Sequence, residues 1–163
     1  MKKQLISNCL WYDSEAEDAA KFYTSIFKNS SIGAVSYYGK EGNEIHHQPE
    51  GKVMSVEFYL DGQKFLGLNG GPLFPFTEAI SLVVNVDTQE EIDYYWNRLT
   101  EGGQESQCGW LKDKFGVSWQ VTPGVLEEML TDPDKTKRER VTKAFMQMKK
   151  FDIQKLQRAF NGE

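Results

Sequence analysis

The order strand, helix, strand, strand, strand occurs twice along this chain, and this repetition constrains the fold more than any other feature. In the first copy, the mostly apolar run 4–11 predicts a strand, and the apolar residues between 16 and 27 recur at helical spacing. Three further strands are expected at 32–38, 52–60 and 63–68. The last two are joined at Asp61-Gly62, a dipeptide typical of a tight hairpin.

The second copy follows Gly70-Gly71-Pro72, which is expected to separate the two. A strand at 79–86 precedes a helix whose apolar stripe runs from Ile92 to Leu99. Three strands are then expected at 104–107, 109–112 and 117–122. A repeated unit that covers only one face of its sheet needs a copy of itself, so we predict an α+β fold of two βαβββ modules, residues 4–70 and 79–122.

Helix starts are expected where a capping side chain precedes an apolar stripe. Two capping boxes are predicted, from Ser14 to Glu17 and from Thr88 to Glu91. In the tail, helices are expected after Thr122-Pro123, Asp132-Pro133 and Asp152.

The tail, residues 123–161, completes what we expect to be one domain over residues 1–163. Val141, Phe145 and Met148 are expected on one helix face, and Ile153, Leu156 and Phe160 on another. Such apolar faces lie either on the sheets or on a second copy of the chain. We favour the second copy, because small proteins commonly form symmetric pairs.

Composition excludes several classes of protein. A hydrophobic fraction of 39% is too high for a disordered chain of 163 residues, and a net charge of −5 argues against nucleic-acid binding. No apolar run is long enough for a membrane span, and no signal peptide is evident. Cys9 and Cys108 are therefore expected as reduced thiols, and the protein is expected in the cytoplasm.

Several strings of this sequence are specific enough to suggest a family. The segments 61–71, 90–96, 108–113 and 116–121 resemble the PhnB-like family, which carries the label 3-demethylubiquinone-9 3-methyltransferase. That family is part of the vicinal oxygen chelate superfamily, with the glyoxalases, bleomycin-resistance proteins and dioxygenases. The resemblance implies two βαβββ modules in a glyoxalase/bleomycin-resistance-like half-open barrel, a homodimer, and a cavity for a small molecule.

The resemblance also implies where a divalent metal would be held in enzymes of the superfamily. Carried over by strand order, these positions are Asn8, Asn69, Ser81 and Gln120. Amides and a hydroxyl are weak ligands for Zn, Ni or Fe, whose protein sites use imidazole, thiolate or carboxylate. We therefore expect no metal and no cofactor.

Aromatic and thiol side chains near the strand ends are further candidates for the cavity lining. Five large aromatic residues are expected mostly in the core, with one or two facing a ligand: Trp11, Phe58, Trp96, Trp110 and Trp119. The predicted ligand-binding residues are Asn8, Trp11, Asn69, Ser81, Cys108, Trp110 and Gln120. For Asn69 and Gln120 the alternative is a structural amide network, and for Cys108 a small buried apolar role.

Other titratable residues have weaker claims to a role in chemistry. His46 and His47 are adjacent and would point to opposite sides of an extended segment, so surface positions are expected. Glu57 alternates with apolar neighbours and is expected to face water, with a general-base role as the alternative. No catalytic residue is assigned.

The sequence therefore favours a metal-free protein that binds or sequesters a small organic compound. A metal-dependent lyase, isomerase or dioxygenase is the first alternative, and an interaction module acting through the tail helices is the second. Methyl transfer is disfavoured, because no glycine-rich turn follows the first strand to receive S-adenosylmethionine.

Overall fold

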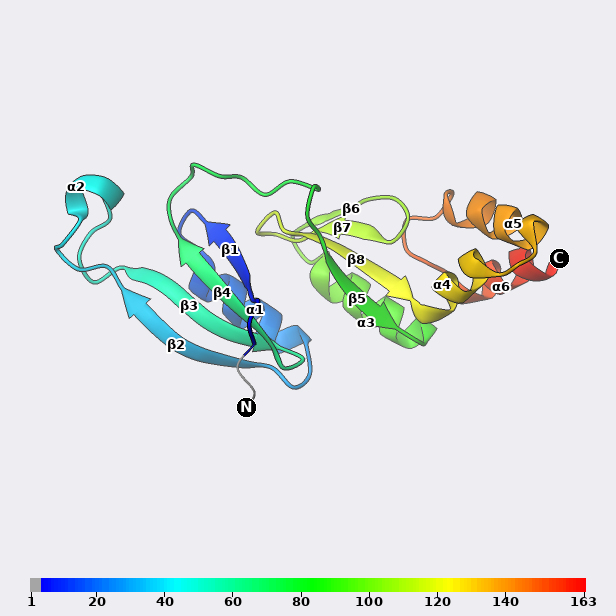
Figure 1. Ribbon diagram of the computed structural model, residues 1–163, viewed down its shortest axis with the longest axis horizontal. Helices are drawn as coiled ribbons and strands as arrows, with labels where there is room; N and C mark the ends of the chain where they lie inside the picture. The colour runs from blue at the N-terminus through cyan, green and yellow to red at the C-terminus, as the bar shows by residue number, and fades with distance from the viewer. Residues whose placement is uncertain (1–3) are drawn as a thin grey trace. The chain divides into compact units, whose positions relative to one another are not determined.

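The chain divides into two compact units that repeat one another in topology. The computed structural model describes residues 4–163, and the first unit ends at Phe76 while the second comprises Thr77–Glu163. In Figure 1 the first unit runs from blue to green and the second from green to red. Whether they form one domain, as expected from the sequence, stays a prediction.

The first unit contains a four-stranded mixed sheet in the order β1-β4-β3-β2. Its elements are β1 (Asn8–Tyr12), α1 (Ala16–Ile26), β2 (Ser31–Tyr37), α2 (Asn43–His46), β3 (Val53–Leu60) and β4 (Gln63–Asn69). The first strand pairs in parallel with the last, so that Asn8 lies opposite Phe65, whereas the other pairings are antiparallel. Asp61 and Gly62 form the predicted hairpin with positive φ values of 46° and 76°, as a tight hairpin turn requires.

The second unit repeats this arrangement as β5-β8-β7-β6, again with the first and last strands parallel. Its elements are β5 (Leu82–Val86), α3 (Gln89–Leu99), β6 (Gln104–Glu105), β7 (Trp110–Lys112) and β8 (Ser118–Pro123). The predicted α+β fold with two βαβββ repeats and C-terminal helices is therefore confirmed.

Each sheet has one face covered by a helix and one open face, because strand residues alternate between the two sides. In the first unit α1 covers the face that carries the buried Val56, Phe58 and Phe65. Gly67 allows this close approach, since a Cβ there would lie only 3.0 Å from Ala16 Cβ. In the second unit α3 lies along the sheet (Figure 1) and buries Ile92, Trp96 and Leu99.

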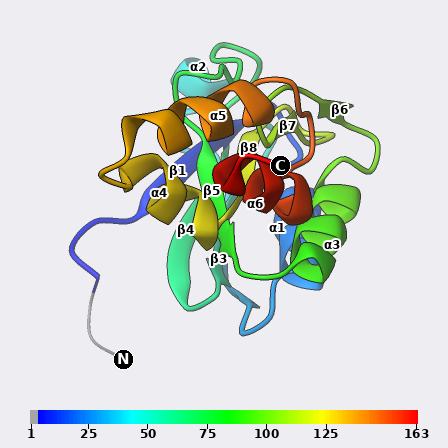
Figure 2. The same ribbon diagram turned by 90° about the vertical axis from the view of Figure 1, so that its right-hand side faces the viewer.

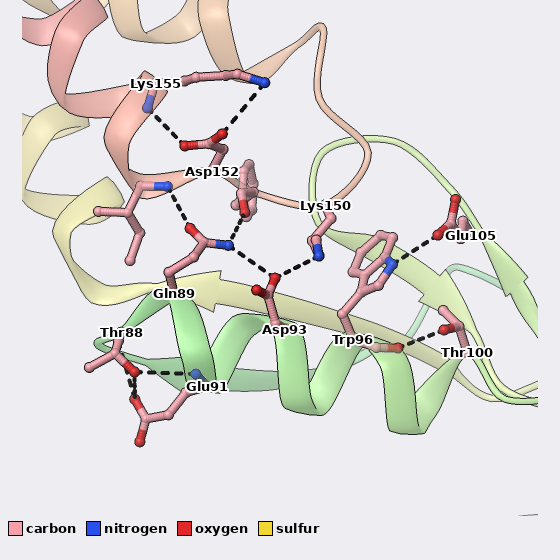
Figure 3. Close-up of polar contacts among 12 residues, drawn as sticks. Thr88, Gln89, Glu91, Asp93, Trp96, Thr100, Glu105, Lys150, Asp152 and Lys155 are labelled. Carbon is pink, nitrogen blue, oxygen red and sulfur yellow. Dashed lines mark hydrogen bonds and ion pairs between the residues drawn. The ribbon is translucent and has the colours of Figure 1, made fainter.

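Helix starts agree with the sequence in two of the predicted places. The Thr88–Glu91 capping box is present: Glu91 N donates to Thr88 Oγ1 and Thr88 N to Glu91 Oε2, both at 3.2 Å (Figure 3). Asp152 caps the last helix by accepting from Lys155 N at 3.0 Å. These starts were predictable because donor and acceptor lie within four residues of each other.

The predicted capping box at Ser14 and Glu17 is wrong. Helix α1 begins at Ala16, and neither of those side chains caps it. Instead, Ala16 N donates to Oδ1 of Asn69 at 2.8 Å, from the end of β4.

Helices follow both of the other positions expected in the tail, but the capping residues predicted for them are wrong. Thr122 and Pro123 continue β8, because they pair with Asn85 and Val86 of β5. Helix α4 (Gly124–Thr131) follows without a side-chain cap. Asp134 caps α5 (Lys135–Phe145), whereas Asp132 had been expected to do so.

The tail helices α4, α5 and α6 (Ile153–Asn161) pack together within the second unit (Figure 2). The chain before α6 is tied to the sheet by two backbone bonds, from Cys108 N to Met148 O and from Gly109 N to Lys149 O, each 2.7 Å. The apolar side chains buried in this region are Leu126, Met129, Val141, Phe151 and Leu156. Of the residues expected to pack on a second copy, Val141 and Leu156 are covered within one chain, so that preference is wrong for these two, and the homodimer stays a prediction.

Gln89, in the first turn of α3, connects this helix to the tail (Figure 3). Its Nε2 donates to Phe151 O at 3.1 Å and to Asp93 Oδ1 at 3.2 Å, and its Oε1 accepts from Ile153 N at 2.9 Å. Asp93 also pairs with Lys150 Nζ at 2.5 Å. One side chain thus satisfies backbone groups on both sides of Asp152.

Replacing Gln89 by alanine is expected to destabilise the second unit by about 1–2 kcal/mol, because two backbone groups of the tail lose their partner. Urea unfolding measures the loss, and hydrogen exchange should show faster exchange of the Ile153 amide. Gln157→Ala, an exposed glutamine on α6, is the matched control and should change neither. Equal stability of the two variants would contradict the role of Gln89.

Candidate functional site

The open face of the second sheet presents two rows of side chains that cross its strands. Cross-strand pairing places Gln104 beside Lys112 and Lys112 beside Ser118, which forms the first row. Two residues along the strands, Trp110 lies beside Gln120 in the second row. Side chains paired in this way are immediate neighbours on the same face of the sheet.

Three of the residues predicted to bind a ligand meet on this face. Gln120 Nε2 donates to Oγ of Ser81 at 2.9 Å, just before β5, and Trp110 is the cross-strand neighbour of Gln120. All three side chains are half-buried. The structure thus brings Ser81, Trp110 and Gln120 together, while their binding of a ligand stays a prediction.

A small cavity of about 130 Å³ opens beside the first row. Its lining residues are Glu78, Gln104, Glu105, Ser106, Trp110, Leu111, Lys112 and Ser118. Ser118 is 2% exposed, and its Oγ has no hydrogen-bond partner in the described part of the chain. Lys112 Nζ contacts Glu78 Oε1 at 2.6 Å, and this bond holds the pKa of Glu78 below its usual value.

The open face of the first sheet carries a different arrangement. Glu57 Oε1 accepts from Tyr59 Oη at 2.6 Å, and its Oε2 pairs with Lys64 Nζ. The bond from Lys64, followed by that from Tyr59, lowers the pKa of Glu57. The same bonds raise the pKa of both partners. A lowered pKa makes the Glu57 carboxylate a weaker base, and both of its oxygens are already paired. The alternative of a general base is therefore less favourable.

Trp11 and Cys9 lie on this same face, beside Leu68 and Leu66 of β4. Trp11 Nε1 donates to Gly71 O at 2.7 Å, and its ring meets Phe74 edge to face with centroids 5.0 Å apart. Partial burial raises the pKa of the Cys9 thiol. The indole nitrogen of Trp11 is therefore occupied within the chain, and its ligand-binding role stays a prediction.

Asn8 and Asn69 lie on the opposite, helix-covered side of the first sheet, since they alternate with Cys9 and Leu68. Asn69 is 2% exposed; besides capping α1, its Nδ2 donates to Val53 O at 3.1 Å. Its backbone carbonyl accepts from Tyr38 Oη at 2.6 Å. These contacts give Asn69 a structural role, but its partners are backbone groups and not the amide network considered from the sequence. Its binding of a ligand stays a prediction.

Cys108 faces the tail. It has a left-handed backbone with φ of 57°, and its Sγ lies 3.8 Å from Phe145 O. Its side chain is half-buried between the sheet and the chain before α6, in line with the small apolar role considered from the sequence. Its place in a ligand site stays a prediction.

Sequence reasoning missed Asp113, Lys112 and Ser118. Asp113 is buried at 3% exposure and accepts from three donors: Phe115 N at 2.9 Å, Val117 N at 3.0 Å and Trp119 Nε1 at 2.7 Å. The signal for Asp113 was an acidic residue at the start of a turn.

Lys112 and Ser118 could have been placed on the open face from strand alternation, because they lie two residues from Trp110 and Gln120.

The donor set does not fit the divalent metal that the superfamily implies. Across residues 4–163, no three side chains from histidine, cysteine, aspartate and glutamate converge as a metal site would need. His46 uses both ring nitrogens within its own loop, toward Glu41 O at 3.2 Å and Gln48 N at 2.9 Å. His47 is exposed, in line with the expected surface position.

Within the same described range, no helix has the length and apolar character needed to cross a membrane.

Comparison with known proteins places these features in a family. Residues 4–122 match the 3-demethylubiquinone-9 3-methyltransferase family. The PhnB protein from Bacillus cereus is 37% identical, with a TM-score of 0.65 over 74% of this chain and 100% of that one. No curated protein matches the chain.

More distant solved structures share the fold. Protein PA1353 from Pseudomonas aeruginosa is 20% identical, with a TM-score of 0.59 over 74% of this chain and 98% of that one. The fosfomycin resistance protein FosX from Listeria monocytogenes, solved with Mn(II) and sulfate, is 19% identical, with a TM-score of 0.53 over 80% and 97%. The chain therefore belongs to the 3-demethylubiquinone-9 3-methyltransferase family, the PhnB-like family of the vicinal oxygen chelate fold.

Proposed function

We propose that this protein binds a small organic molecule on the open face of its second sheet, and that it does so without a metal ion. The observation that carries the proposal is the cavity beside Lys112 and Ser118, in which a buried hydroxyl has no hydrogen-bond partner among residues 4–163. A buried polar group without a partner is costly, at about 1–3 kcal/mol, and such groups are rare outside sites that receive a ligand, ion or water.

The surroundings of the cavity suit an organic ligand. Trp110 offers a half-buried aromatic surface, and the amide of Gln120 is held in place by its bond to Ser81. Binding sites for small molecules combine apolar surface with a few fixed polar groups in this way.

Metal independence is supported by the chemistry of the donors. Those on the second open face are amide, hydroxyl and ammonium groups together with Glu78, and on the first face Glu57 is held by Lys64 and Tyr59. None of these sets resembles the imidazole and carboxylate clusters that bind Zn, Ni, Fe or Mn. Holding a compound without converting it, as in sequestration, needs no further group.

A thermal-shift screen tests the proposal, using metabolite acids, quinones, antibiotics and metal salts on protein purified without added metal. We expect one class of organic compound to raise the melting temperature, since a ligand at 100 times its Kd stabilises the native state by about 2.7 kcal/mol. Trp110→Ala should abolish the shift. Tyr37→Ala, which truncates an exposed aromatic residue of the first unit, should retain it.

Two results would contradict the proposal. Stoichiometric Mn, Fe, Ni or Zn, lost together with an activity on chelation, would favour a metal-dependent lyase, isomerase or dioxygenase. A screen in which no compound shifts the melting temperature would favour an interaction module.

A further inference from the structure

Three buried polar side chains stand out among the described residues, and one of them differs from the other two. Asn69 and Asp113 use their side-chain oxygens within the chain, toward Ala16 N and toward the three donors near Asp113. Ser118 is equally buried, yet its hydroxyl has no partner. The first two contacts build the fold, whereas the hydroxyl of Ser118 is covered without a partner and would gain one from a group that reaches it.

The neighbour of Ser118 across the strands is a cation. Lys112 pairs in register with Ser118, so the two side chains lie on the same face at contact distance, and both line the cavity. The ammonium group of Lys112 has three N–H donors, and its contact with Glu78 does not use all of them. Lys112 and Ser118 together offer hydrogen-bond donors to an anion at the same place.

The chain already places a carboxylate at this position. Glu78 precedes β5, lines the cavity and contacts Lys112 Nζ at 2.6 Å, while 64% of its own side chain stays exposed. An exposed ion pair of this kind is weak, at about 0–1 kcal/mol, so an incoming anion can replace Glu78. The other carboxylate of the lining, Glu105, is held by Trp96 Nε1 at 3.0 Å and Lys149 Nζ at 3.4 Å.

Resting on the proposed function, we propose that Lys112 and Ser118 bind the carboxylate of a small organic acid, which displaces Glu78 from Lys112. The cavity of about 130 Å³ accommodates a group of a few heavy atoms, because an apolar cavity of about 150 Å³ holds benzene. The carboxylate enters it, and the apolar remainder of the acid lies against Trp110, which lines the same cavity.

The experiment compares acids with their uncharged amides: benzoate with benzamide, and indole-3-acetate with indole-3-acetamide. Each is titrated at constant ionic strength while the backbone amide signals of Trp110, Lys112 and Ser118 are followed by NMR. We expect each acid to bind at least about tenfold more tightly than its amide, since charge-assisted hydrogen bonds are about twice as strong as neutral ones.

Three variants assign the effect to the subsite. Glu78→Gln removes the competing carboxylate and should tighten acid binding by about threefold to tenfold. Lys112→Met should weaken it at least about tenfold, and Ser118→Ala by about threefold to tenfold. Lys155→Met, an exposed lysine paired with Asp152, is the control for the loss of one positive charge and should leave the affinity unchanged.

The outcomes separate the two proposals. If the amides shift the Trp110 signal as strongly as the acids, or if Glu78→Gln leaves acid affinity unchanged, the carboxylate subsite is wrong while binding on this face stands. If neither acids nor amides shift Trp110, both the subsite and the binding face are wrong. The melting temperature of each variant is measured as well. If it is unchanged, a loss of affinity does not result from a loss of folding.

Discussion

Asp113→Ala is expected to lower the free energy of unfolding of the second unit by about 3–5 kcal/mol. The substitution leaves three donors without their acceptor, the amides of Phe115 and Val117 and the indole Nε1 of Trp119. Each unpaired buried donor costs about 1–3 kcal/mol, and hydrogen bonds to a charged acceptor lie at the upper end of this range. Chemical denaturation followed by tryptophan fluorescence measures the loss.

The asparagine variant of the same residue is the matched control. Asp113→Asn keeps an oxygen for the two backbone amides but no acceptor for the indole, so an intermediate loss is expected, about 1–3 kcal/mol. An alanine variant within about 1 kcal/mol of the wild type would show that Asp113 does not hold this turn.

Asn69→Ala is expected to lower the free energy of unfolding of the first unit by about 2–4 kcal/mol. It removes the cap on Ala16 N and the hydrogen bond to the carbonyl of Val53, both made by a side chain of a residue that is 2% exposed. Faster hydrogen exchange at the Ala16 amide should accompany the loss of stability.

Ser14→Ala provides the contrast for this prediction. If Ser14 capped α1, as its sequence position suggests, the substitution would cost about 1 kcal/mol. Because Asn69 supplies the cap, we expect a change within about 0.5 kcal/mol. Equal losses in the Ser14 and Asn69 variants would contradict the assignment.

The features that could be predicted from the sequence are those fixed by neighbouring residues. The two βαβββ repeats follow from apolar periodicity, the turn at Asp61-Gly62 from its tolerance of positive φ, and the start of α3 from the Thr88–Glu91 box. The start of α1 could not be predicted, because its cap comes from Asn69 on another strand. Thr122 and Pro123 were expected to begin a helix, but they belong to β8 because they pair with residues of β5.

The candidate site divides in the same way. Trp110, Gln120 and Ser81 were predicted and are brought together, since resemblance and strand alternation place them on one face. The distinction between Ser118 and Asp113 could not be predicted. It depends on which buried polar group finds a partner after the chain has folded, and a list of residues does not contain that information.

The parallel pairing of the first and last strands has a consequence for the order of assembly. In each unit the strand that leaves the ribosome first has its partner at the far end of the repeat, since Asn8 pairs with Phe65 and Leu82 with Trp119. Such distant contacts raise the contact order, which slows folding. Each nascent repeat therefore carries an unpaired leading strand until its closing strand has been synthesised, and this interval is when the growing chain is most open to capture by chaperones.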